Sequence, residues 1–123
     1  MPLTIPAKAE HRTFLYSEPC LDLDALSADI AYLGIPYGAS YTFGEIANDQ
    51  SRGALAMRRA TDRILRSIER YDFDLGGPMY DHRPIRAVDC GDVYADPREH
   101  GDHLQRAEEV VRKIVASGAL PII

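Results

Sequence analysis

Two short segments carry the side-chain types that hold metal ions or move protons in enzymes. Residues 89–92 (Asp-Cys-Gly-Asp) place two carboxylates and a thiol at the end of an apolar run, and residues 101–103 (Gly-Asp-His) place an acid beside an imidazole. Carboxylates and imidazoles bind divalent cations, and both groups serve as general acids or bases. Metal-assisted or acid–base chemistry is therefore the first possibility that these residue types raise.

The context of each segment favours a structural role. His100, Asp102 and His103 follow a proline-containing turn and run into a helix, so we expect a solvated first helical turn with acidic groups that complement the helix dipole. At residues 89–92 we expect a structural arrangement in which Asp92 accepts hydrogen bonds from loop N–H groups and Gly91 permits a bend or close approach. Cys90 is expected to be a small core residue, because no base that could activate it is identifiable. We therefore assign no catalytic residue and no metal ligand within this chain.

A long polar and aromatic segment, residues 37–51, follows the first apolar run. Ligands of α/β proteins bind at the carboxyl ends of the strands, and long loops at that place are commonly functional. We predict that four of its side chains contact the amine or guanidinium group of a substrate: Tyr37, Tyr41, Asn48 and Asp49. The alternative is a surface loop that packs on its own apolar side chains, and both remain open at this point.

Three apolar runs predict the strands that would position these segments. The first, residues 29–36, has almost no polar alternation; residues 85–93 form the second, and residues 120–123 begin the third. Such short apolar runs are typical of strands covered on both faces, as in a parallel sheet. With a helix predicted in each interval, the order favours parallel strands joined by right-handed crossovers.

The first predicted helix covers residues 53–71. Its apolar stripe, at three- and four-residue spacing, consists of Met57, Ala60, Ile64, Leu65 and Ile68. The arginines that lie off this stripe are Arg52, Arg58, Arg59, Arg63, Arg66 and Arg70. We expect them to form a solvated face paired with acidic neighbours, or a subunit contact, rather than a phosphate site.

The second predicted helix begins at residues 96–99 (Asp-Pro-Arg-Glu), a capping pattern, and ends at Gly118. Its predicted buried face consists of Leu104, Ala107, Val110, Val111, Ile114 and Val115.

The predicted fold class is α/β, a three-layer αβα arrangement around a parallel sheet, incomplete and ending in its third core strand. Residues 1–28 are broken by prolines and are expected to form an N-terminal arm with one short helix near Leu21–Leu26. Residues 29–123 are expected to form the α/β domain. Within it, residues 71–75 alternate in polarity like a short, half-exposed strand.

Composition narrows the possible partners. The 123-residue chain has a net charge of −5, which disfavours a nucleic-acid partner. We find no apolar run of membrane-spanning length and no signal peptide, and two cysteines are too few for a disulfide framework, so a cytoplasmic location is expected. Neither a Gly-x-Gly-x-x-Gly segment nor a P-loop is present, which disfavours a nucleotide-binding domain.

Three stretches, in order, resemble the ureohydrolase family of arginases and agmatinases. They are residues 33–36 (Leu-Gly-Ile-Pro), residues 53–61 (Gly-Ala-Leu-Ala-Met-Arg-Arg-Ala-Thr) and residues 88–93 (Val-Asp-Cys-Gly-Asp-Val). The second is similar to the family's Gly-Pro-x-Ala-Ile-Arg, with Ala54 in place of the proline, and the third to its Asp-x-Gly-Asp-Val. A helix and residues 119–123 then follow in the family's order.

The resemblance implies an arginase-like fold and hydrolysis of a guanidino compound, agmatine-like, to urea and an amine. It also implies two Mn²⁺ ions that share a nucleophilic hydroxide, and a homo-oligomer for the intact enzyme. In the family, the first metal ligand lies in a Leu-Gly-Gly-Asp-His segment directly after a strand like residues 120–123. This chain is therefore expected to be the N-terminal part of such an enzyme, without metal ligands and inactive alone. Residues 49–52 (Asp-Gln-Ser-Arg) stand where many members carry Gly-Ala-Arg, so the substrate is not fixed by the resemblance.

The alternative function is a non-catalytic structural or interaction module from a truncated or split gene. In that case the last strand, residues 120–123, would leave an open sheet edge, and unpaired strands invite association with a partner.

Overall fold

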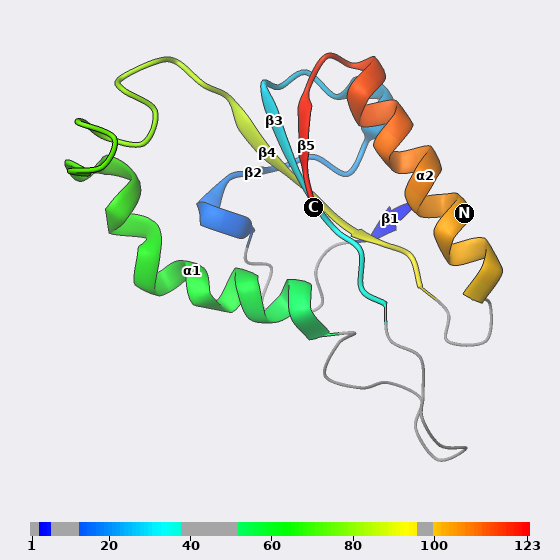
Figure 1. Ribbon diagram of the computed structural model, residues 1–123. Coiled ribbons are helices and arrows are strands. Elements are labelled where there is room, and N and C mark those ends of the chain that lie inside the picture. The colour runs from blue at the N-terminus through cyan, green and yellow to red at the C-terminus, as the bar shows by residue number, and fades with distance from the viewer. Residues whose placement is uncertain (1–2, 6–12, 38–51, 96–99) are drawn as a thin grey trace.

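The computed structural model of the chain describes residues 3–5, 13–37, 52–95 and 100–123. Figure 1 shows how the elements are arranged. In chain order they are β1 (Thr4–Ile5), η1 (Phe14–Tyr16), β2 (Glu18–Pro19), η2 (Leu23–Ala25), β3 (Ile30–Gly34), α1 (Gly53–Glu69), β4 (Ala87–Val93), α2 (His100–Ala116) and β5 (Leu120–Ile122). Neither α-helix combines the length and apolar character that a bilayer crossing requires within the described residues.

The three predicted core strands form a parallel sheet. β3 lies in the centre and pairs with β4 on one edge and with β5 on the other. The two long helices lie on opposite faces of this sheet (Figure 1). The α/β class with a parallel sheet is therefore confirmed for the part of the chain that the structure describes, and strand, helix, strand, helix and strand follow in the predicted order.

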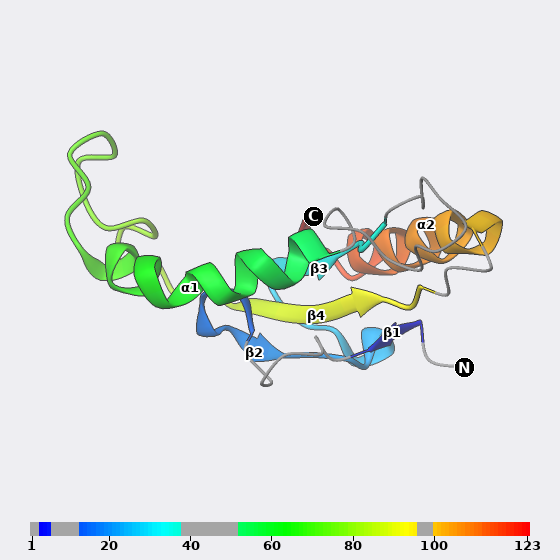
Figure 2. The same ribbon diagram turned by 90° about the horizontal axis from the view of Figure 1, so that it is seen from below.

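Two short strands near the N-terminus extend the sheet, and the sequence did not predict them. β2 pairs with the first half of β4 in parallel, and β1 pairs with its last two residues in an antiparallel arrangement. Figure 2 shows both strands along the same edge of β4. At two residues each, they are too short for a period-2 pattern to be read. The 3-10 helix η2 lies within the segment in which a short helix was predicted.

The face covered by α2 holds the apolar core. Ala107, Val110 and Ile114 of α2 belong to one buried cluster with residues of the sheet and of η2. Its other members are Ala31, Leu33, Val88, Cys90, Val93, Leu23, Leu26 and Ala119. Leu104 and Val115 were predicted to be buried and are exposed, because they lie at the margins of a helix face that is narrower than predicted. Gly118 adopts a φ of 89°, which permits the C-terminal stop expected there.

The predicted apolar stripe of α1 is wrong in its first half. Met57 is 61% exposed and Ala60 also faces solvent, whereas Arg58 and Thr61 are buried. Only Ile68 of the predicted stripe is half-buried among the residues whose side chains are described. The physical reason is that this face of the sheet presents carboxylates, so the helix turns a cation and a hydroxyl toward it.

Residues 71–75 are not a strand. A turn occupies most of the segment, closed by an isolated antiparallel bridge between Asp72 and Gly77. Oδ1 of Asp72 accepts hydrogen bonds from the backbone N–H groups of Asp74 and Leu75, at 2.8 and 3.1 Å. An aspartate that bonds the backbone just after it, followed by a glycine at φ 71°, stabilises a turn over an extended ladder.

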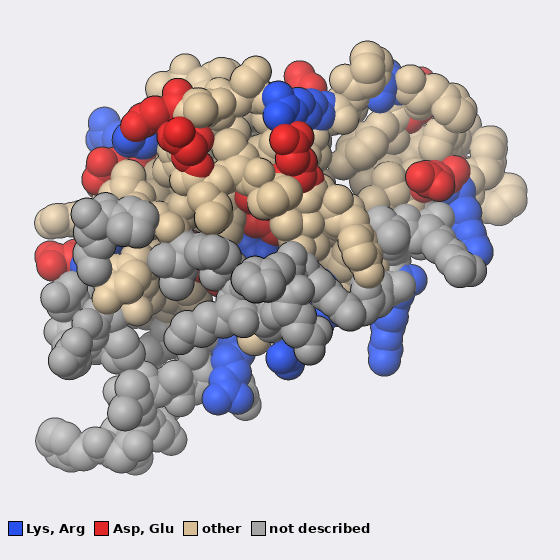
Figure 3. Space-filling view, turned by 180° about the vertical axis from the view of Figure 1, so that it is seen from behind, with Lys and Arg blue, Asp and Glu red and all other residues tan. Residues whose placement is uncertain are grey.

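Figure 3 shows charged side chains of both signs on one face of the described surface. The face in Figure 3 shows basic and acidic groups as separate clusters among other residues. On this face, the part of the chain that the structure describes offers no continuous basic surface of the kind that binds nucleic acid.

Candidate functional site

The carboxyl end of β4 is irregular, and the irregularity brings two aspartates together. Tyr32 pairs with Asp89 and Gly34 pairs with Asp92, so three steps along β4 oppose two steps along β3. Without this bulge, residues three apart would point to opposite faces of the sheet. Gly91 takes up the distortion with a φ of 76°, in the left-handed region that glycine tolerates. The predicted bend at Gly91 is therefore confirmed.

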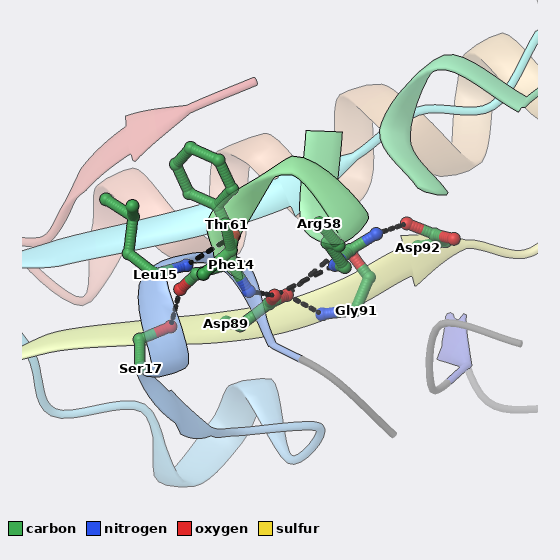
Figure 4. Close-up of polar contacts among 8 residues, drawn as sticks. All are labelled: Phe14, Leu15, Ser17, Arg58, Thr61, Asp89, Gly91 and Asp92. Carbon is green, nitrogen blue, oxygen red and sulfur yellow. Dashed lines mark hydrogen bonds and ion pairs between the residues drawn. The ribbon is translucent and has the colours of Figure 1, made fainter. Parts of the chain in front are cut away.

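Arg58 of α1 joins the two carboxylates. Its Nε and Nη2 donate to Oδ2 and Oδ1 of Asp89, both at 2.9 Å, and its Nη1 donates to Oδ1 of Asp92 at 2.5 Å. Nη2 also donates to the carbonyl oxygen of Gly91 at 3.0 Å. Figure 4 shows the guanidinium between the two aspartates. The forked, planar guanidinium can satisfy one carboxylate with two hydrogen bonds and still reach a second.

The same carboxylate anchors the N-terminal segment. Oδ2 of Asp89 accepts the backbone N–H of Phe14 at 2.7 Å, and Oδ1 accepts the backbone N–H of Gly91 at 2.8 Å. One turn of α1 after Arg58, Oγ1 of Thr61 accepts the backbone N–H of Leu15 at 3.1 Å. These bonds hold η1 between α1 and the sheet (Figure 4). The cluster of Arg58, Asp89 and Asp92 therefore connects β4, α1 and η1.

The ionic states of this cluster follow from its burial and its partners. Arg58 and Asp89 are 4% and 2% exposed. Burial alone would lower the pKa of Arg58, but the hydrogen bonds and negative charges of Asp89 and Asp92 outweigh it and raise the pKa above its usual value. The guanidinium is therefore a permanent cation at the strand ends. A buried pair of this kind is costly to break, because either partner alone would be an uncompensated charge.

Gly34 completes the packing at this end of the sheet. A side-chain β-carbon at position 34 would overlap Oδ1 of Asp92, lie 2.9 Å from its Cγ and approach Cβ of Ala54 to 3.0 Å. Glycine at the end of β3 therefore lets the Asp92 carboxylate lie against the backbone, within reach of Arg58.

The acidic pair is a poor candidate for a metal centre. Both carboxylates already have a guanidinium as their counter-ion, and both oxygens of Asp89 already accept hydrogen bonds. No group of three or more His, Cys, Asp or Glu side chains is placed to share a metal ion within the described ranges. These residues therefore do not fit a two-metal site, and the role of the cluster is to hold β4, α1 and η1 together. The structural role expected for Asp89 and Asp92 agrees with this geometry. The described bond of Asp92 comes from Arg58, whereas the backbone N–H groups of Phe14 and Gly91 bond to Asp89, so within the described residues the expected pairing of Asp92 with loop N–H groups is wrong.

Cys90 lies on the opposite face from the aspartates. It is fully buried, and burial raises the pKa of its thiol to about 12. The thiol is therefore protonated near neutral pH, as expected for a core residue and unlike a nucleophile.

One of the four predicted substrate-contacting residues lies within the described part of the chain. Tyr37 is 47% exposed, and its ring stacks on that of His103, with centroids 5.8 Å apart and an interplanar angle of 11°. Tyr41, Asn48 and Asp49 lie outside the described residues. The prediction that these four side chains contact a substrate therefore stays a prediction.

The sequence predicted that His103 lies in a solvated helical turn, and this prediction is wrong. Its side chain is buried, and its Nδ1 lies 3.4 Å from the carbonyl oxygen of Tyr94, which also accepts a hydrogen bond from Nη1 of Arg106 at 2.9 Å. Asp102 is exposed, as expected for a first helical turn. The stack of Tyr37 on His103 thus joins the segment after β3 to the first turns of α2.

The sequence analysis wrongly placed Arg58 on the solvated face of the first helix. A signal for it was available in the spacing, because Ala54, Arg58, Thr61 and Ile68 lie on one helix face at steps of four, three and seven. Two aspartates at a strand end also require a counter-charge when they are buried. A search for apolar residues alone misses this face, because two of these four residues, Arg58 and Thr61, are polar.

One comparison with known proteins matches most of this chain. A sequence model described as the arginase family matches residues 28–123, which include β3, α1, β4, α2 and β5. A comparison with curated protein sequences found no match.

Proposed function

We propose, from the premise that the chain belongs to the arginase family, that it supplies the strand-end platform of a ureohydrolase. Membership in the family indicates hydrolysis of C–N bonds. We propose a linear, agmatine-like guanidino compound as the substrate, with urea and an amine as products. The observation that carries the proposal is the buried Arg58. It connects two of the stretches that resemble the family, the helix start at residues 53–61 and the strand at residues 88–93, in one site.

The platform has a defined task in this proposal. Arg58 holds the carboxyl end of β4 in its bulged form, and Gly34 holds the end of β3 against Asp92. A reacting site at the strand ends needs side chains held within a fraction of an ångström, and rigid strand ends provide that. Two Mn²⁺ ions would have to be bound by residues outside those described, because the aspartates of the platform are neutralised by Arg58.

The chain by itself is proposed to be inactive. The experiment compares this chain with the same chain joined to whatever polypeptide its gene encodes after Ile123, each supplied with Mn²⁺ and assayed for urea from agmatine and from arginine. We expect urea only from the longer protein, with agmatine the better substrate. Urea release by the 123-residue chain would contradict the inactivity, and a longer protein that binds Mn²⁺ without releasing urea would contradict the ureohydrolase function.

A second candidate is an interaction module, and it is favoured by the outer edge of β5, which pairs only with β3 among the described residues. Leu120 donates its N–H to the carbonyl of Asp29, 2.8 Å away, so the carbonyl of Pro121, a residue without an N–H, faces away from β3. Leu120, Ile122 and Ile123 are 59%, 42% and 68% exposed. Light scattering during size-exclusion chromatography tests this function. A specific oligomer, or a complex with a second polypeptide, would support it, and a monomer at all concentrations would count against it.

We further propose a reducing, cytoplasmic location and a homo-oligomeric intact enzyme. The free thiols of Cys20 and Cys90 are compatible with a reducing compartment. Fractionation of cells that express the native gene would test the location, and the chromatography above would test the assembly.

A further inference from the structure

A cavity of about 300 Å³ lies on the α1 side of the sheet. It is bounded by the C-terminal end of α1, by residues 15–17 and by the beginning of β4. None of Arg58, Asp89 and Asp92 lines it, although Asp89 lies two residues beyond Ala87 of the cavity wall and accepts the N–H of Phe14 beside it. The proposed function places its chemistry at the carboxyl ends of the strands and gives this cavity no role.

Three tyrosines and one carboxylate give the cavity its chemical character. Tyr16, Tyr32 and Tyr80 line it together with Glu69, and its other walls are mostly apolar. The hydroxyl oxygens of Tyr32 and Tyr80 are 3.2 Å apart. Among the residues whose side chains the structure describes, the lining contains no lysine and no arginine. Aromatic faces and a carboxylate attract cations, and they disfavour anions.

The wall formed by residues 15–17 has an unusual backbone. Leu15 and Tyr16 both have a φ of 53°, in the left-handed region that costs a residue with a β-carbon about 1 kcal/mol. Three hydrogen bonds hold this conformation (Figure 4). The backbone N–H groups of Phe14 and Leu15 donate to Asp89 and Thr61. The Oγ of Ser17 donates to the carbonyl of Phe14 at 2.7 Å. Strained residues that persist because buried groups fix them are common where a ligand is held.

We propose that this cavity binds a small organic cation of the ammonium or guanidinium class. The cation would lie against the tyrosine rings, with the Glu69 carboxylate as its counter-ion and the phenol hydroxyls as hydrogen-bond acceptors. The volume is at the lower end of the range for small-molecule sites, which limits the ligand to a compact one. Because Glu69 is exposed, the ion pair is formed at the rim, and the rings supply the contact inside.

The test uses the 123-residue chain, labelled with ¹⁵N and kept free of divalent metal. Tetramethylammonium and methylguanidinium are titrated against it, with tert-butanol and urea as neutral molecules of matched shape. We expect saturable shifts of backbone signals around residues 15–17, 69, 80 and 87 with the two cations and weaker or no shifts with the neutral molecules. Equal binding of the neutral molecules, or shifts that map to the carboxyl ends of the strands, would overturn the proposal.

Two substitutions and a matched control sharpen the result. Glu69→Gln removes the carboxylate charge and Tyr16→Leu removes one ring, and each is expected to weaken cation binding about threefold or more. Glu109→Gln removes an exposed carboxylate from α2 and should leave the affinity unchanged. Unchanged affinity in both cavity variants would overturn the proposal. Since no metal and no turnover are involved, this outcome does not depend on whether the ureohydrolase function is correct.

Discussion

The two faces of the sheet are held by different physics. On the α2 face, aliphatic side chains of the helix form one apolar cluster with buried residues of β3 and β4, and the helix pattern predicted most of them. On the α1 face, the helix packs chiefly against η1 and reaches β4 through the guanidinium of Arg58. The α2 face derives its stability from apolar area removed from water, whereas the α1 face depends on a few directional, charge-assisted bonds.

This difference predicts how each face responds to change. Apolar packing degrades gradually, because each lost methylene costs a fraction of the whole. A buried ion cluster fails abruptly, because loss of one partner leaves the others charged and desolvated. The α1 face should therefore be the more sensitive to a single substitution, and the α2 face the more tolerant.

Substitution of the central cation should have the largest effect. Arg58→Leu leaves the carboxylates of Asp89 and Asp92 without their counter-ion, and we expect a loss of about 3–5 kcal/mol in the free energy of unfolding. Urea denaturation followed by circular dichroism measures it. The neighbouring Arg59→Leu, on the exposed side of α1, should change the free energy by less than about 0.5 kcal/mol.

A double substitution makes this prediction sharper. Adding Asp89→Asn to Arg58→Leu removes one of the orphaned charges, so the double variant should be less destabilised than the sum of the two single variants. Additive losses, or equal stabilities of the Arg58→Leu and Arg59→Leu proteins, would show that the cluster is not what holds the α1 face.

Gly34→Ala should have the next largest effect. The new β-carbon would overlap the Asp92 carboxylate and push it away from Arg58, at an expected cost of about 1–3 kcal/mol. Gly53→Ala is the matched control, because its β-carbon would meet nothing within 4 Å at the start of α1. The control should be neutral or slightly stabilising. If both glycines tolerated alanine equally in thermal unfolding, the close approach at Gly34 would be refuted.

A pair of conservative substitutions compares the two faces directly. Thr61→Val removes the oxygen that accepts the N–H of Leu15, and we expect a cost of about 1–3 kcal/mol because that donor then lacks a partner. Ile114→Val removes one methylene from the α2 core, at a cost of about 0.5–1.5 kcal/mol. Hydrogen exchange of the Leu15 amide should accelerate in the first variant alone. Unchanged exchange there would contradict the bond to Thr61.

The smallest effect at neutral pH concerns the buried thiol. Burial raises the pKa of Cys90 from 9.0 to about 12, so the folded chain retains a proton that the unfolded chain releases. Its contribution to stability is present below about pH 9 and is lost as the pH rises toward about 12. Cys90→Ala should therefore flatten the alkaline decline in the free energy of unfolding, compared between about pH 7 and about pH 10.5. A decline as steep as in the unsubstituted protein would contradict this assignment, and Cys20→Ala, at a less buried thiol, should change the slope less.

The sequence by itself determined the parallel core, both long helices and the buried side of α2. These features arise from short-range patterns, since apolar runs and three- to four-residue spacings reflect local periodicity. It also identified the strand-end segment 89–92 as structural, because an aspartate can bond to nearby backbone N–H groups and Gly91 permits a bend.

Only the tertiary structure decided which face of α1 is buried. Arg58 is 31 residues from Asp89 along the chain, and no local pattern encodes that a bulge at Gly91 will turn two aspartates toward the same cation. The edge strands β1 and β2, the tyrosine-lined cavity and the burial of His103 arise in the same way. Each depends on groups distant in sequence that become neighbours after folding, when desolvation favours arrangements in which buried charges and donors have partners.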